Sequence, residues 1–240
     1  MLSSKIKNMS HPIDPELAGI ENIPLFEGLS ESELANLIKV SHERLCSARE
    51  FFFMQGEPAD RMFVLTDGRI KLSQVGEGGQ QVLIHVITPV HLFALVAMTS
   101  MKFYPVSAQA AQDSRAIYWT RQEIMEFVLQ YPVLAMNAMR IMAEQVIELQ
   151  ERFREATTER VDHRLARTLM RLAGQSGRKI EEGILIDLPI TRQDLAEMSG
   201  TTLYTASRLL SQWELQGLVI LRRKKVIVRF PHELVGIIES

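Results

Sequence analysis

A long helix with one narrow apolar stripe divides this chain into two parts of different character. Within residues 139–153, apolar side chains recur at alternating intervals of three and four residues, which keeps them on one side of an α-helix. They are Met139, Met142, Val146, Leu149 and Phe153. The flanking residues are largely charged, so the pattern predicts a helix over residues 132–158 that pairs with a second copy of the chain. The alternative is a helix lying on its own domain. A hinge is expected near Thr157, where the stripe ends.

The part before this helix is rich in short β-type runs. Gly, Pro and Asp lie between the runs, as is usual for turns. The runs cover residues 51–54, 61–65, 70–74, 81–87 and 115–119. Strands this short and this closely spaced predict an antiparallel barrel or sandwich. Capping boxes at Ser30/Glu33 and Thr120/Glu123 predict that a helix begins on each side of it.

The part after the helix has the order of a winged helix-turn-helix. A helical pattern over residues 161–174 and a β run over 184–190 precede a short helix that Thr191 and Asp194 cap. Gly200 breaks this helix, a second helix runs over about 202–216, and a hairpin with basic residues at its tip follows. Residues 191–229 hold seven Lys and Arg against three Asp and Glu. This excess is suited to a local patch that binds a polyanion.

The second of these helices has the residues that base reading in the DNA major groove requires. Its apolar residues gather mostly on one side, and Tyr204, Thr205, Ser207 and Arg208 spread over the rest. An arginine fork matches O6 and N7 of guanine, and a hydroxyl can contact a base edge or a phosphate. We therefore expect this helix to face double-stranded DNA.

With these elements in place, the chain resembles the bacterial transcription-regulator family of the cyclic-AMP receptor protein and the fumarate–nitrate reduction regulator. The segments that carry the resemblance, in order, are LFEGLSESEL, GEPAD, DGRIKL, YPVSAQA, TRQDLAEMSGTT and SRLLSQWELQGL. The resemblance implies an α+β fold with an N-terminal arm over 1–20, a cyclic-nucleotide-binding-like β-roll sensor domain over 21–131, a dimerisation helix over 132–158 and a winged helix-turn-helix domain over 159–240. It also implies a homodimer that binds a palindromic operator and recruits RNA polymerase or blocks it.

The resemblance also assigns roles to single residues. Thr191, Arg192 and Gln193 match positions that anchor DNA phosphates, and Ser207 and Arg208 match positions that read bases. Tyr204 replaces a glutamate that is common in the family, which leaves the half-site sequence open. The residues expected to contact DNA are Thr191, Arg192, Gln193, Thr201, Thr202, Tyr204, Thr205, Ser207, Arg208, Arg222, Arg223, Lys224 and Lys225.

The sensor segment departs from the cyclic-nucleotide binders of the family. Those proteins hold the ligand with a Gly-Glu and an Arg-Ser pair, and the matching pairs here are Ala94-Leu95 and Pro105-Val106. Without the carboxylate and the cation, cyclic AMP is not expected to bind. Cys46 is the chain's one cysteine, so an iron–sulfur cluster is not expected either.

The segment FYPVSAQAAQDS is similar to the branch of the family that responds to nitric oxide, in part through haem. The candidate haem ligands or effector contacts are His85, His91, Met98 and Met101. An organic effector, or no effector, stays open, and the cofactor is not identified.

No catalytic residue and no metal site are expected. The stretch from His42 to Cys46 begins like an H-E-x-x-H metalloprotease helix but lacks the second histidine. A β-barrel metal enzyme using His85 and His91, or a regulatory subunit that does not bind DNA, are the rival classes. With one cysteine, no signal-peptide pattern and no apolar run of membrane-spanning length, we expect a cytoplasmic protein with no membrane partner.

Overall fold

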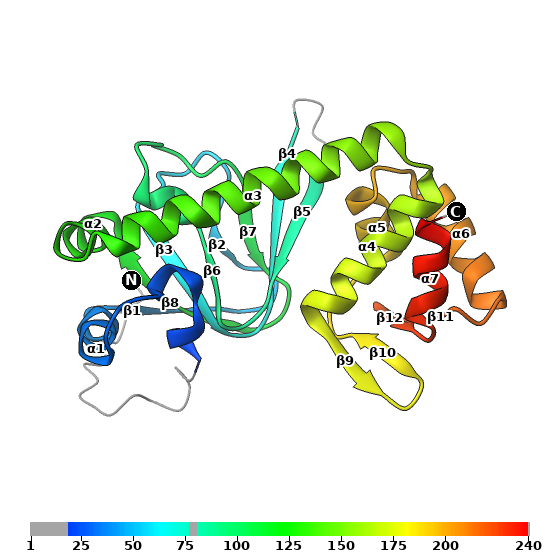
Figure 1. Ribbon diagram of the computed structural model, residues 1–240, viewed down its shortest axis with the longest axis horizontal. Helices are drawn as coiled ribbons and strands as arrows, with labels where there is room; N and C mark the ends of the chain where they lie inside the picture. The colour runs from blue at the N-terminus through cyan, green and yellow to red at the C-terminus, as the bar shows by residue number, and fades with distance from the viewer. Residues whose placement is uncertain (1–18, 77–80, 240) are drawn as a thin grey trace.

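A computed structural model describes residues 19–76 and 81–239 of the chain, apart from the side chains of Arg152 and Ala156. The N-terminal arm predicted for residues 1–20 therefore lies almost wholly outside the described residues. Figure 1 shows a β-rich part at one end, a helical part at the other, and helix α3 running alongside the first part towards the second. This is the α+β architecture that the sequence predicts.

The β-rich part is built from two antiparallel sheets, so the expected barrel or sandwich is confirmed. Within the described residues, one sheet has the order β1 (His42–Cys46), β8 (Ser114–Thr120), β3 (Arg61–Asp67), β6 (His91–Phe93). The other has the order β2 (Phe51–Phe53), β7 (Ser107–Ala110), β4 (Ile70–Val75), β5 (Gln81–Ile87). All five predicted runs are strands; β1, β6 and β7 were not predicted. Because His42–Cys46 is a strand, it does not form the helix of a metalloprotease site.

Aromatic side chains fill the space inside the roll. Phe53 stacks on Tyr104 with ring centroids 3.8 Å apart, and Phe63 stacks on Phe93 at 5.0 Å. Phe52 meets both Phe63 and Phe93 edge to face. All five rings are buried, and offset or edge-to-face pairs of this kind stabilise a core beyond their buried area. The interior of the roll is therefore occupied by the protein's own side chains.

Short helices cover the roll and both predicted capping boxes are present. They are η2 (Ile20–Asn22), η3 (Pro24–Phe26), α1 (Glu31–Lys39), η4 (Leu95–Met98) and α2 (Arg121–Gln130). Ser30 caps α1 and Thr120 caps α2, each with the glutamate three residues later. In the second box Glu123 also bonds to His42, with 2.8 Å between Oε1 and Nε2. Burial raises the pKa of Glu123, but the hydrogen bonds from His42 and Thr120 outweigh it and hold this pKa below its usual range.

Helix α3 extends from Val133 to Thr158, close to the predicted range. Its first turns are fixed to the roll because the buried Asn137 amide donates to the carbonyls of Leu25 (3.0 Å) and Glu27 (2.7 Å). Leu134 and Ala138 are buried in the same hydrophobic cluster as Trp119. The later turns of α3 leave this cluster, which sets up the exposed face described below.

The helical part contains α4 (Val161–Ser176), α5 (Arg192–Met198), α6 (Leu203–Leu215) and α7 (Pro231–Ile238). A sheet with the order β11 (Val219–Arg222), β12 (Lys225–Val228), β10 (Gly183–Ile186), β9 (Gly177–Ile180) lies beside them. Leu169 of α4, Leu195 of α5 and Trp213 of α6 share one core. The helix-turn-helix with a wing is confirmed; β9 and α7 were not predicted.

The two parts touch through strands β4 and β5. Leu83 and Val86 of β5 are buried in the hydrophobic cluster of the helical part. Lys71 Nζ lies 2.7 Å from Asp194 Oδ2, and a guanidinium nitrogen of Arg69 lies 3.8 Å from Asp187 Oδ2. Asp194 is the carboxylate of the capping box of α5. The sensor-like sheet therefore contacts the first helix of the helix-turn-helix directly.

Candidate nucleic-acid interface

The helix-turn-helix is shaped by hydroxyl caps and one left-handed turn. The Thr191 hydroxyl accepts from the Asp194 backbone N–H (3.1 Å), and the Thr202 hydroxyl accepts from the Thr205 N–H (3.2 Å). Between the helices Gly200 has φ +61, a conformation that glycine adopts without a steric penalty. No atom outside its neighbours comes within 4 Å of a Cβ placed there, so the backbone angle alone explains the glycine.

Helix α6 buries one face and exposes the other at its N-terminal end. Ala206, Leu210 and Trp213 are buried, whereas Tyr204 is 78% exposed and Arg208 is exposed. Tyr204 and Arg208 are four residues apart, so they lie on the same side of the helix. The predicted apolar face, which also included Leu215, is thus correct at its centre but wrong at Leu215, which is 90% exposed. At roughly 100° per residue, Leu215 lies on the side of the helix opposite Ala206.

The other residues of these two helices that are predicted to contact DNA differ in their exposure and in their hydrogen-bond partners. Arg192 and Gln193 are exposed, although the Gln193 amide donates to Glu197 (2.8 Å). Thr201, Thr205 and Ser207 are half-buried, and the Thr205 hydroxyl lies 3.0 Å from that of Thr202.

The wing presents cations beside the start of α5. Strands β11 and β12 pair from Val219/Val228 to Arg222/Lys225, which leaves Arg223 and Lys224 as the turn. Lys224 has φ +58, so the turn places a non-glycine residue in the left-handed region. The four basic residues are exposed, but the Arg222 guanidinium is 2.7 Å from Glu182 Oε1. That ion pair was not predicted, and a phosphate group at Arg222 would have to displace Glu182.

A hollow of about 240 Å³ lies between the wing and α5. Its lining includes Thr191, Arg192 and all four basic wing residues, together with apolar residues of α5, the wing and the segment before α5. Clustered cations around a concave surface attract phosphate groups. The structure therefore brings the predicted phosphate contacts of α5 and of the wing together in one place.

Arg164 of α4 connects the end of α3 to the turn of the helix-turn-helix. Its guanidinium donates to the carbonyls of Glu159 (2.6 Å), Ser199 (3.0 Å) and Gly200 (3.1 Å). Arg167 adds an ion pair with Glu159, at 3.0 Å. Hydrogen bonds and an ion pair from two arginine side chains therefore span the predicted hinge near Thr157. Nothing in the sequence pattern marks Arg164, because two of its three partners are backbone atoms about 35 residues away.

The segment that matches the cyclic-nucleotide cassette has no group that would bind a cyclic phosphate at the expected positions. Ala94 has φ +63, a backbone angle suited to the glycine of the family, and Leu95 is buried. Pro105 is exposed and Val106 is half-buried. At these four positions the structure thus has apolar side chains only.

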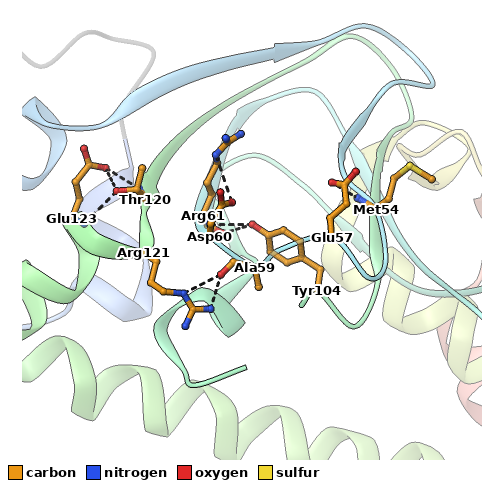
Figure 2. Close-up of polar contacts among 9 residues, drawn as sticks. All are labelled: Met54, Glu57, Ala59, Asp60, Arg61, Tyr104, Thr120, Arg121 and Glu123. Atoms are coloured by element: carbon orange, nitrogen blue, oxygen red, sulfur yellow. Dashed lines mark hydrogen bonds and ion pairs between the residues drawn. The ribbon is translucent and has the colours of Figure 1, made fainter. Parts of the chain in front are cut away.

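Figure 2 shows polar contacts that link loops of the roll close to Pro105 in the sequence, including those of Tyr104 and Arg121. The Arg121 guanidinium donates to the carbonyls of Ala59 (2.6 Å), Met101 (2.6 Å) and Thr99. The Tyr104 hydroxyl donates to the Arg61 carbonyl (2.8 Å), and burial raises the pKa of Tyr104 to about 12. These groups hold loops together, and the guanidinium is already occupied by carbonyl oxygens.

The four haem or effector candidates lie in different surroundings. His85 is on β5 in one sheet, whereas the exposed His91 is on β6 in the other, with its Nδ1 3.1 Å from the Pro89 carbonyl. Met98 packs against the cluster beneath α3, and Met101 is exposed. The four residues thus come from different elements and have different surroundings, which does not favour a common role in binding haem. Among the described residues no group of three or more His, Cys, Asp or Glu is placed to hold a metal ion.

Helix α3 keeps most of the predicted dimer stripe exposed. Met139, Val146, Leu149 and Phe153 are 57%, 52%, 66% and 70% exposed. Met142 is an exception, because it is half-buried against the cluster of the roll. Ile147 is also exposed, at 56%, although the stripe omits it. In the described part of the chain, no helix is both long and apolar enough to cross a membrane.

Two family models match this chain. The Crp-like helix-turn-helix domain matches residues 163–237, and the cyclic nucleotide-binding domain matches residues 43–131. These ranges contain the winged helix-turn-helix and the β-roll. The DNA-binding and sensor parts thus each belong to a recognised domain class.

Similar proteins match this chain over most of its length. The CRP-like cAMP-activated global transcriptional regulator of Mycobacterium tuberculosis (strain CDC 1551 / Oshkosh) is 21% identical over 204 residues, covering 85% of this chain and 91% of the relative. The transcriptional activator protein Anr of Pseudomonas protegens is 24% identical over 227 residues, covering 95% and 92%. The structure of FixK2 from Bradyrhizobium japonicum superposes with a TM-score of 0.72 at 19% identity, covering 82% and 96%.

Proposed function

Because this chain belongs to the CRP/FNR family of DNA-binding transcription regulators, we propose that it binds a palindromic operator as a homodimer and does not respond to cyclic AMP. The family consists of transcription factors and not enzymes. The observation that carries the proposal is the exposed Arg208 on α6, in the same domain as the cationic hollow between α5 and the wing. The first supplies a base-reading group and the second supplies phosphate contacts.

The dimer is inferred from helix α3. Four apolar side chains at heptad spacing are more than half exposed, and water contact with such a row is unfavourable. Pairing two copies of α3 along this row would bury them. A two-fold dimer would place its two recognition helices about one DNA turn apart, so the operator half-sites should be centred ~10–11 bp apart.

The rejection of cyclic AMP is supported by two features of the roll. The matching cassette positions are Ala94, Leu95, Pro105 and Val106, which offer neither a carboxylate nor a cation. The interior is filled by the stacked rings of Phe53, Tyr104, Phe63 and Phe93. An organic effector or no effector fits these features. A nitric-oxide response through haem has no support from the positions of His85, His91, Met98 and Met101.

Selection from random DNA duplexes tests the DNA-binding proposal. The full chain should enrich a palindrome, and Arg208→Ala should weaken binding to it by about 1–3 kcal/mol. Neutralising Lys224 and Lys225 to Gln should weaken all duplexes alike and flatten the dependence of affinity on salt, because these residues are proposed to contact phosphates. Enrichment of no sequence, or equal affinity of the Arg208→Ala protein, would contradict the proposal.

A further inference from the structure

The first turn of α6 exposes two large side chains that the phosphate and guanine contacts do not use. Leu203 is 47% exposed and Tyr204 is 78% exposed, directly after the Thr202 cap. No hydrogen bond or ion pair of the described residues involves Tyr204. In a helix-turn-helix, the N-terminal residues of the second helix are those that contact base edges. These two side chains therefore lie where a duplex would be read.

Major-groove chemistry offers one apolar partner to such side chains. Adenine, guanine and cytosine present hydrogen-bonding groups there, whereas thymine also presents its 5-methyl group. Tyr204 presents an aromatic ring there and has no carboxylate to accept from the amino group of cytosine. A leucine and an aromatic ring instead gain free energy by removing a methyl group from water.

We propose that Leu203 and Tyr204 form an apolar contact with a thymine methyl group in each half-site. This inference rests on the proposed function, and it specifies the base class that the same surface selects. Arg208 lies one helical turn after Tyr204 on the same face, so the thymine belongs to the same half-site as the guanine assigned to Arg208. Exposure alone does not carry the assignment, since Leu215 is 90% exposed at the C-terminal end of α6, away from the N-terminal residues that contact base edges.

The test begins with selection from random duplexes by the full chain. We expect every enriched palindrome to contain an invariant thymine in each half-site. The enriched duplex is then synthesised with deoxyuridine in place of that thymine, which removes only the methyl group. Loss of one buried methyl contact should weaken binding about fourfold with one half-site changed, and roughly 10- to 20-fold with both changed.

Variants of α6 separate this contact from general binding. Leu203→Ala and Tyr204→Ala should bind the thymine and deoxyuridine duplexes with nearly equal affinity, while Tyr204→Phe should keep the preference. Tyr204→Glu should shift the selected base towards cytosine, whose amino group a carboxylate accepts. Leu215→Ala is the matched control, because it removes an exposed leucine from the same helix and should keep the full preference.

The outcomes distinguish the two proposals. Palindromes without an invariant thymine, or equal affinity of the wild-type chain for thymine and deoxyuridine duplexes, would overturn the methyl contact and leave the DNA-binding function intact. Unchanged discrimination in both alanine variants would overturn the assignment to Leu203 and Tyr204. Enrichment of no palindrome would overturn the proposed function and this inference together.

Discussion

At the scale of single residues, Arg164 connects separate segments of the DNA-binding domain. Its guanidinium satisfies three carbonyl oxygens, two of them at the turn between α5 and α6. Carbonyls at helix ends have no partner within their own helix, so a charged donor from outside stabilises the turn. Asn137 acts similarly for the segment before α1, because its amide donates to two carbonyls there. Both are polar residues whose role is to order a loop.

Replacing Arg164 should therefore destabilise the DNA-binding domain. Arg164→Ala leaves the carbonyls of Ser199 and Gly200 without this donor, and hydrogen bonds to charged groups contribute about 1.5–3 kcal/mol. We expect the free energy of unfolding in urea to fall by about that amount. Arg223→Ala removes an exposed arginine of the wing turn and should leave stability unchanged. Equal unfolding curves for the wild-type and Arg164→Ala proteins would contradict this role.

At the scale of elements, helix α3 has two functions along its length. Its first turns bury Leu134 and Ala138 against the roll, and its later turns expose Val146, Leu149 and Phe153. Met142 lies at the boundary and packs against the roll, so the exposed row is shorter than the heptad pattern indicates. Because Met142 interrupts the row after the exposed Met139, the unbroken part runs from Val146 to Phe153, and dimer pairing should be concentrated in the second half of the helix.

A charge placed in this row should separate the proposed dimer. Leu149→Glu would bury a carboxylate in the seam of both chains, and loss of a buried leucine alone costs about 2–5 kcal/mol. We expect the dissociation constant of the dimer, measured by analytical ultracentrifugation, to rise more than about 100-fold. Glu151→Lys also changes a charge, but heptad spacing places it on the opposite face, and it should not affect association. A Leu149→Glu protein that stays dimeric would argue against the seam.

At the scale of the whole molecule, the sensor-like sheet and the DNA-binding domain form a joint interface. Leu83 and Val86 are buried in the core of the other domain, and Lys71 pairs with Asp194. Burial of a valine side chain contributes about 1.5–3 kcal/mol, whereas a partly exposed ion pair contributes about 0.2–1 kcal/mol. Apolar contact therefore dominates this interface, and the ion pair aligns strand β4 with the N-terminal end of α5.

Weakening this interface should release α5 from strand β5. We expect Val86→Ser to accelerate amide hydrogen exchange in residues 82–87 and 192–198. Lys71→Gln should have a smaller effect, because the ion pair contributes less free energy to the interface than burial of the valine side chain does. Lys102→Gln removes an exposed lysine elsewhere in the roll and serves as the control. Exchange rates that match the wild type in the Val86→Ser protein would show that the contact does not hold the domains together.

The sequence by itself determined the parts of this protein that depend on neighbours in the chain. The caps at Ser30, Thr120 and Thr191, the long helix and the helix-turn-helix with its basic wing all follow from residue types within a few positions of one another. The five most β-rich runs were predicted for the same reason. The exposure of Arg208 also follows locally, because the opposite face of α6 is apolar.

Only the tertiary structure decided features that join distant segments. Strands β1, β6 and β7 contain no β-branched residue, and partner strands elsewhere in the chain pair with them. The packing of Met142, the Arg222–Glu182 ion pair and the Arg164 contacts join residues from separate elements. The joint interface brings Lys71 to Asp194 across 123 positions. Such contacts depend on how distant segments are brought together by folding, and the spacing of residues within a few positions of one another does not predict them.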